Sequence, residues 1–131
     1  MKKSLSPAAA ALLCGLLLYA GTAAAYNVND LNKLKETNAC VSCNLTGAPL
    51  AGAVLSGADL TGSNLTTATL LNAKLDKAKL AGANLGGAQL NSADLKGADL
   101  TGANLTGANL SGATWIDGTT CKPGSFGKCR K

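Results

Sequence analysis

Leucine recurs at every fifth position of this chain, fourteen times without an omission from Leu45 to Leu110. Trp115 takes the next place in the series. A small residue stands two places before each of these large ones, Ala in thirteen units and Cys43 or Ser63 in the other two. A helix would carry every fifth residue progressively around its surface, and a strand alternates with a period of two. The pattern therefore predicts an array of short stacked units that share one core.

The other positions of each unit are mostly polar residues or glycine. Glycine stands two places after most of the leucines, where a corner of the chain would need a backbone geometry that glycine tolerates. Three successive units between Thr66 and Leu80 lack it.

Units such as Ala-Asp-Leu-Thr-Gly at 58–62 and Ala-Asn-Leu-Thr-Gly at 103–107 define the run A(D/N)LXX, which extends over 43–116. This run resembles the pentapeptide-repeat family. The resemblance implies an all-β fold, a right-handed quadrilateral β-helix with four pentapeptides per coil. It also implies that the central leucine and the small residue two places before it point inward, so a bulky replacement of Ala83 or Ala88 should overpack a narrow interior. The fifteen units would make just under four coils.

Charged residues twenty positions apart are consistent with a coil of four units. Four such pairs occur, all of opposite sign: Asp59/Lys79, Lys79/Asp99, Lys74/Asp94 and Asp76/Lys96. Opposite charges on neighbouring strands stabilise their pairing, whereas like charges would repel. Each aspartate is expected to lie beside a lysine that lowers its pKa.

The first 25 residues have the pattern of a secretory signal. Lys2 and Lys3 precede an apolar stretch over 8–21, and Ala23–Ala25 supply small residues for cleavage before Tyr26. Fourteen apolar residues are too few to span a bilayer of ~30 Å, and Leu13 disfavours lipidation at Cys14. Export to the periplasm or the medium is expected, with no transmembrane anchor after cleavage.

Both ends of the repeat array are expected to be capped. In the segment 26–42, the spacing of Val28, Leu31 and Leu34 predicts a short helix over 29–37, capped by Asn29 or Asp30 and packed on the first coil. Trp115 is predicted to plug the other end, beneath the tail 117–131.

After removal of the leader, four cysteines remain: Cys40, Cys43, Cys121 and Cys129. An even number in an exported chain indicates disulfides. In the implied solenoid the coils rise by ~4.8 Å, which separates the two ends by roughly 15 Å. A disulfide requires Cα atoms within ~7 Å, so Cys40–Cys43 and Cys121–Cys129 are the expected pairs. A redox-active C-x-x-C at Cys40 stays open as an alternative.

Composition disfavours catalysis. The chain has no histidine, so schemes that need an imidazole are excluded, and its serines and threonines lack an activating base. No enzyme activity, cofactor or metal is expected. The formal charge of +5 includes two lysines of the leader. The remaining excess lies in the tail, where Lys122, Lys128, Arg130 and Lys131 outnumber Asp117. Nucleic acid is therefore not expected as a partner, and the tail alone is a candidate contact for an anionic envelope surface.

Two surfaces are candidates for binding. Four asparagines are predicted to stack in one column, which could bind a regular ligand such as a glycan or ice: Asn44, Asn64, Asn84 and Asn104. The second candidate is a partner surface on the irregular units: Leu71, Lys74, Lys77 and Lys79. For both patterns an ordinary solvated surface is the favoured explanation, and binding is the alternative.

These features favour a non-enzymatic, exported scaffold or protein-interaction module with an unidentified partner in the cell envelope. A ligand-binding module that uses the Asn/Thr face is one alternative, and a redox-active envelope protein is another. Some cytosolic members of the family present an acidic surface that imitates DNA to a topoisomerase. The repeat body here has four lysines and four aspartates, so such imitation is not expected.

Overall fold

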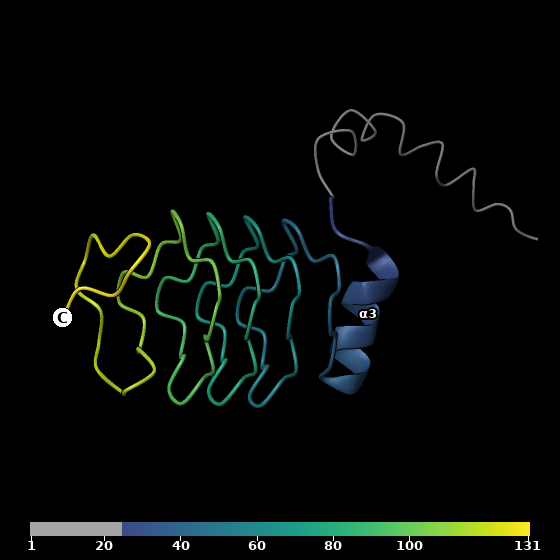
Figure 1. Cartoon of the computed structure of the whole chain (residues 1–131), viewed down its shortest axis with the longest axis horizontal. Coiled ribbons are helices and arrows are strands. Elements are labelled where there is room, and N and C mark those ends of the chain that lie inside the picture. Colours follow the sequence, from purple (N-terminus) through teal and green to yellow (C-terminus); the bar gives the residue numbers. More distant parts are fainter. Residues whose placement is uncertain (1–24) are drawn as a thin grey trace, which may run out of the picture.

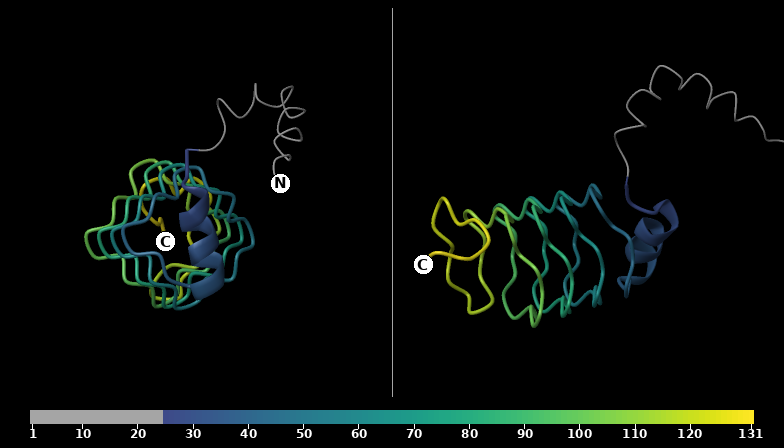
Figure 2. Two further views of the ribbon diagram at one scale, coloured as in Figure 1. Left: turned by 90° about the vertical axis from the view of Figure 1, so that its right-hand side faces the viewer. Right: turned by 45° about the horizontal axis from the view of Figure 1, so that its top comes forward.

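The computed structural model describes residues 25–131 as a stack of four-sided coils, with a single helix across its N-terminal end (Figure 1). Viewed along the stack, successive coils superpose in one four-sided outline (Figure 2). Except for Ala25, the expected signal sequence lies outside the described residues, as does Cys14. No helix in 25–131 has the length and apolar character needed to cross a bilayer.

Parallel bridges between single residues hold the coils together, in place of extended strands. Every parallel bridge joins residues twenty positions apart, as Asn44–Asn64 and Asn64–Asn84 do, which confirms four units per coil. Units of the inner coils donate in both directions along the stack. The N–H of Leu65 donates to the Asn84 carbonyl at 2.7 Å, and the N–H of Asn64 donates back to Cys43 at 2.9 Å.

We name the four sides of the coil by the residues at their centres. Face A is centred on Leu45, Leu65, Leu85 and Leu105; face B on Leu50, Leu70, Leu90 and Leu110; face C on Leu55, Leu75, Leu95 and Trp115; and face D on Cys40, Leu60, Leu80 and Leu100. Among the central leucines, all but Leu100 and Leu105 are buried, and the small residues beside them, Ala83 and Ala88 included, fill the rest of the core. Trp115 is only partly buried.

The corner residue, two places after the central residue, has a positive φ in every unit from Cys40 to Leu110. In the unit of Trp115 the positive φ falls one residue later, at Gly118. Most of these corners are glycine, as expected. The irregular units keep the same geometry without it, with φ of 56° at Thr67, 58° at Asn72 and 61° at Lys77. The corner is therefore imposed by the stack, and glycine is the residue that adopts it with least strain.

A side-chain hydrogen bond explains the Asn or Asp before so many of the leucines. Its Oδ1 accepts from the backbone N–H two places on, at 3.0 Å both for Asn64 with Thr66 and for Asn104 with Thr106. This Asx turn leads the chain into the corner.

Helix α3 (Val28–Thr37) begins earlier than the sequence predicted. Asn27 caps it, because the Asn27 side chain accepts from the N–H groups of Asn29 and Asp30. Neither Asn29 nor Asp30 is the cap. Leu31 and Leu34 pack on the first coil as expected, but Val28 is 58% exposed, so the expectation that it also covers the coil is wrong.

The solenoid also starts one unit before the predicted boundary at Cys43. Ala39 bridges to Asp59, and Ser42 has the positive φ of a corner residue. The N–H of Cys40 donates to the Asp59 carbonyl at 2.7 Å. Cys40 therefore occupies the central position of an additional unit, where other units place leucine.

The C-terminal end is half covered, contrary to the expectation of complete caps. The tail pairs antiparallel with the last coil at Asn109–Phe126 and Thr114–Thr120, on faces B and C. On faces D and A, the backbone N–H groups of Leu100, Gly102, Leu105 and Gly107 donate no hydrogen bond within 25–131. Leu100 and Leu105 are only partly buried for the same reason.

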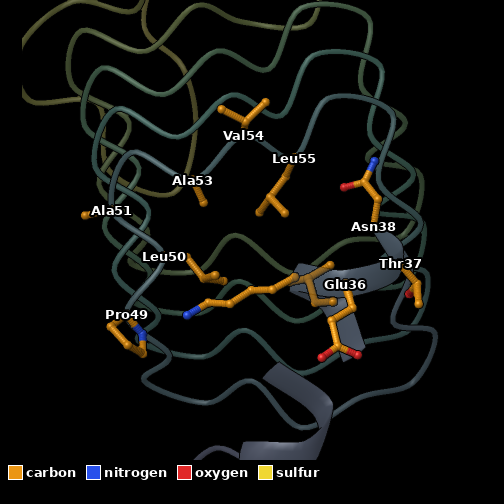
Figure 3. A pocket seen from close by; sticks show the side chains of 11 residues that line it. Glu36, Thr37, Asn38, Pro49, Leu50, Ala51, Ala53, Val54 and Leu55 are labelled. Carbon is orange, nitrogen blue, oxygen red and sulfur yellow. The ribbon is translucent and has the colours of Figure 1, made fainter. Parts of the chain in front are cut away.

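The N-terminal end is covered over its opposite half. Helix α3 approaches face A, where the N–H of Asn27 donates to Asn44 at 2.9 Å and the N–H of Asn44 donates to the Asp30 carboxylate at 2.8 Å. Beside faces B and C it leaves an open groove of about 530 Å³. Figure 3 shows this groove between the end of α3 and the stretch 49–55, where Val54 is 71% exposed.

Candidate functional site

Both expected cysteine pairs lie at disulfide-bonding distance. The sulfur atoms are 2.02 Å apart in Cys40–Cys43 and 2.01 Å apart in Cys121–Cys129. The first pair spans a corner of the first coil, since a central residue and the small residue of the next unit are three positions apart. It thus links two core positions that elsewhere hold leucine and alanine.

Ser63 completes this corner, a role that we did not expect. At an ordinary corner the small residue donates its N–H to the preceding central carbonyl, as Ala48 does to Leu45 at 3.0 Å. At the disulfide corner the N–H of Cys43 instead donates to Ser63 Oγ at 3.1 Å, and the Ser63 hydroxyl donates to the Cys40 carbonyl. The signal was available in the sequence, because Ser63 breaks the alanine series twenty positions after Cys43.

The environment of Cys40 and Cys43 favours a structural role over a redox role. Cys40 is fully buried and Cys43 is 6% exposed, so a reductant has little access to either sulfur. Asp30 brings a carboxylate near them, and the three possible ligand atoms lie within 4.8 Å of one another. Both sulfurs are already used in the disulfide, and the carboxylate accepts from Asn44.

The four asparagines do stack on face A, but their side chains are largely occupied. Asn64 Oδ1 accepts from both the N–H and the hydroxyl of Thr66, at 3.0 and 2.5 Å, and Asn44 makes the same pair of bonds with Thr46. Asn104 donates to Asn84 along the column at 3.2 Å. Gly86 interrupts the threonine column. This face offers few free acceptors to a ligand.

The predicted lysine surface is divided among several faces. Leu71 lies on face B, Lys74 on face C, Lys77 at the following corner and Lys79 on face D. Only Lys74 and Lys77 line a common hollow, of about 630 Å³. We call it the face-C hollow, and its other lining residues are Ser56, Asp76, Asp94, Lys96, Gly97, Ile116 and Asp117.

Stacking of successive coils creates the face-C hollow, which explains why sequence neighbours alone did not reveal it. Lys74 bridges to Asp94 in the next coil, and Lys96 follows Asp76 by the same twenty positions. Ser56 donates to the Asp76 carboxylate at 2.5 Å. The result is a rigid surface on which three lysines alternate with three aspartates.

The charged residues stack in register without forming the expected close contacts. In 25–131, the ion pair that forms is Lys131–Asp117, outside the four predicted pairs. The Thr61 hydroxyl, and then the Thr61 N–H, lower the pKa of Asp59, and Lys79 contributes less than either. Thr101 lowers the pKa of Asp99 in the same way. Hydrogen bonds of the Asx turn, more than lysines, thus lower the pKa values of Asp59 and Asp99.

Three of the carboxylates are unsuited to act as general acids, because a general acid needs a raised pKa. The pKa values of Asp59, Asp99 and Asp117 are lowered, Asp117 by Lys131 first and then by Thr119. Such groups stay ionised at neutral pH and serve as hydrogen-bond acceptors.

Comparison with known proteins agrees with this geometry. Eight copies of the family described as pentapeptide repeats match residues 43–82 and 78–114. The chain belongs to the pentapeptide-repeat family. No curated protein matches it.

Solved pentapeptide-repeat structures resemble the chain. alr5209 from Nostoc PCC 7120 is 36% identical with a TM-score of 0.63, over 68% of this chain and 75% of alr5209. HetL from the same strain, described as involved in heterocyst differentiation regulation, is 38% identical over 63% of this chain and 42% of HetL, with a TM-score of 0.40. Rfr23 from Cyanothece 51142 is 33% identical over 65% of this chain and 82% of Rfr23, with a TM-score of 0.37. The likeness to alr5209 supports a right-handed β-helix.

Proposed function

We propose that this pentapeptide-repeat protein is an exported, non-enzymatic scaffold that binds a protein partner in the cell envelope through the face-C hollow. The observation that carries the proposal is the alternation of three lysines and three aspartates on one rigid surface. Face A, by contrast, satisfies most of its polar groups internally.

The stacked backbone supports a role in binding. Lys74 and Lys77 project from coils whose backbone hydrogen bonds continue above and below them, so the backbone at both residues is ordered before a partner arrives. A surface that is already ordered loses little conformational entropy on binding. Alternating charge selects a partner with the complementary pattern and disfavours one with a single sign.

Export rests on the leader and the cysteines. The first 25 residues have the pattern of a signal sequence, and all four cysteines outside them pair as disulfides. Disulfides persist in oxidising compartments such as the periplasm.

The test is affinity capture from envelope extract with matched variants. Wild-type protein is compared with the double variant Lys74→Gln, Lys77→Gln in the hollow, and with Lys33→Gln, Lys35→Gln on α3. Both variants remove two exposed positive charges. We expect the wild type and the α3 variant to retain the same partner and the hollow variant to lose it. Equal capture by all three would contradict the proposal.

The redox alternative makes a separate prediction. If Cys40 and Cys43 only stabilise the fold, the folded protein should show no thiol that reacts with a maleimide until it is denatured in the presence of a dithiol. Rapid reduction of this disulfide in the folded protein would favour redox activity instead.

A further inference from the structure

The positive charge of this protein is concentrated at one end of the rod. Residues 25–116 contain six lysines and six acidic residues. Residues 117–131 contain Lys122, Lys128, Arg130 and Lys131 against Asp117 alone, which leaves an excess of +3. Lys131 pairs with Asp117, so Lys122, Lys128 and Arg130 carry this excess at the C-terminal end, opposite α3 (Figure 1).

The loop 121–130 that holds these three cations is tightly constrained. The Cys121–Cys129 disulfide closes it, and the N–H of Lys122 donates to the Arg130 carbonyl at 2.7 Å. Ser125 is fully buried inside the loop; its hydroxyl donates to the Lys122 carbonyl at 2.7 Å and accepts from the N–H of Arg130 at 3.0 Å. The cations are exposed on a fixed backbone, so binding would cost little ordering of the chain.

The same loop exposes the single phenylalanine of the chain. Phe126 is 59% exposed, although both neighbouring residues are tied to the last coil. The N–H of Leu110 donates to the Ser125 carbonyl at 2.7 Å, and the N–H of Gly127 donates to Ala108 at 2.8 Å. The phenyl ring is thus held in solvent on the same loop as the three cations.

We propose that the loop 121–130 docks the rod on an anionic phospholipid bilayer. Lys122, Lys128 and Arg130 contact the lipid phosphates, and the Phe126 ring enters the interfacial layer, as apolar groups flanked by cations do. Lipid fits this surface better than nucleic acid does. A nucleic acid needs a positive stripe along its path, and the coils behind the loop are neutral.

Docking by the tip would leave the face-C hollow open to a partner, so this inference extends the proposed function without depending on it. Each cation near an anionic surface contributes about fivefold to the partition coefficient, so three give roughly a hundredfold. Partial burial of a phenyl ring contributes about tenfold more.

The experiment is co-sedimentation of the full chain, without its leader, with vesicles of equal parts phosphatidylcholine and phosphatidylglycerol. Vesicles of phosphatidylcholine alone serve as the neutral reference. The loop variant is Lys122→Gln, Lys128→Gln, Arg130→Gln, and a second variant is Phe126→Ser. The matched control removes three exposed charges outside the loop and the face-C hollow instead, by Lys33→Gln, Lys35→Gln and Lys79→Gln. Thermal unfolding of each variant verifies that it folds.

We expect binding to the anionic vesicles only, weakened by salt, lost about a hundredfold in the loop variant and about tenfold in Phe126→Ser. The control should bind within about threefold of wild type, because its charges lie away from the membrane. Absence of binding to anionic vesicles at low salt would overturn the proposal. Equal losses in the loop variant and the control would also overturn it, as would binding to duplex DNA but not to vesicles.

Discussion

Equivalent positions in this solenoid contribute differently to stability, because their side chains meet different groups in the neighbouring coils. Ser63 shows this most clearly, because it occupies a position where thirteen other units have alanine. The disulfide corner above it leaves the Cys43 N–H and the Cys40 carbonyl without their usual bond to each other, and the buried Ser63 hydroxyl satisfies both.

Replacement of Ser63 by alanine should therefore lower stability, although alanine is the consensus residue. Two buried polar groups would lose their partner, at a cost of about 1–3 kcal/mol in the free energy of unfolding. Ser56→Ala removes an exposed hydroxyl that water can replace, so it should change stability by less than about 0.5 kcal/mol. Urea unfolding of both variants is the measurement. Equal effects would contradict the role assigned to Ser63.

Thr67 presents the opposite case, a side chain that its corner does not favour. Its φ of 56° is unfavourable for a β-branched residue by about 1–2 kcal/mol, more than the conformational entropy that glycine loses on folding. Thr67→Gly should raise the free energy of unfolding by about 1 kcal/mol in the same assay.

Thr69 is the control for this change, since it lies outside the corner and does not have a positive φ. Thr69→Gly should lower stability by about 0.5–1 kcal/mol. A loss of stability at both positions would mean that the corner imposes no strain on Thr67.

At the scale of the repeat unit, the Asx turn and the left-handed corner act together. Aspartate and asparagine are interchangeable in this turn at neutral pH, because both present Oδ1 to the N–H two places on. Only aspartate makes the turn dependent on pH. The pKa values of Asp59, Asp99 and Asp117 are lowered by their hydrogen bonds, so the ionised form stabilises the fold.

The stabilisation from these three aspartates should be complete above about pH 4 and decrease as pH falls below it, because protonation removes the favoured form. A triple variant with Asp59→Asn, Asp99→Asn and Asp117→Asn keeps the turns. Its melting temperature should depend less on pH between about pH 4 and 2 than that of wild type. Parallel curves for the two proteins would assign the acid sensitivity to other carboxylates.

The repeat itself could be predicted from sequence because almost every unit has leucine at its centre and a small residue two places before it. Leucine and alanine periodicity fixes which side chains are buried, and the coil of four units follows from the family resemblance. Contacts that are made only once were harder to predict, and the helix cap was predicted wrongly. Asn27, Asn29 and Asp30 are all residue types that cap helices, and the bond from the Asn27 N–H to Asn44 helps to decide among them.

The candidate site was only partly predictable for a related reason. Lys74, Lys77 and Lys79 are close in sequence, but each corner turns the chain, so Lys74 and Lys79 lie on different faces. Residues twenty positions apart, such as Lys74 and Asp94, share a face. The surface that a partner would contact is therefore formed by residues twenty positions apart, more than by residues adjacent in sequence.

At the scale of the whole molecule, the rod ends in two half-covered coils. Helix α3 leaves the stretch 49–55 open at one end, and the tail leaves 98–107 open at the other. An exposed strand edge can template association, but two flat coils cannot approach to ~4.8 Å while a helix or a loop occupies part of either end. We therefore expect half a cap to prevent strand pairing between the ends of two rods.

Amide hydrogen exchange, resolved by residue, tests this architecture most directly. The coil register predicts slow exchange for the inner ladder amides, such as those of Leu65 and Leu85, which donate to the next coil at 2.7 Å. It predicts fast exchange for the uncovered edge amides of Leu100, Gly102, Leu105 and Gly107, although Leu100 and Leu105 occupy the same position in their units. Equal protection of the inner and the edge amides would contradict the half-covered solenoid.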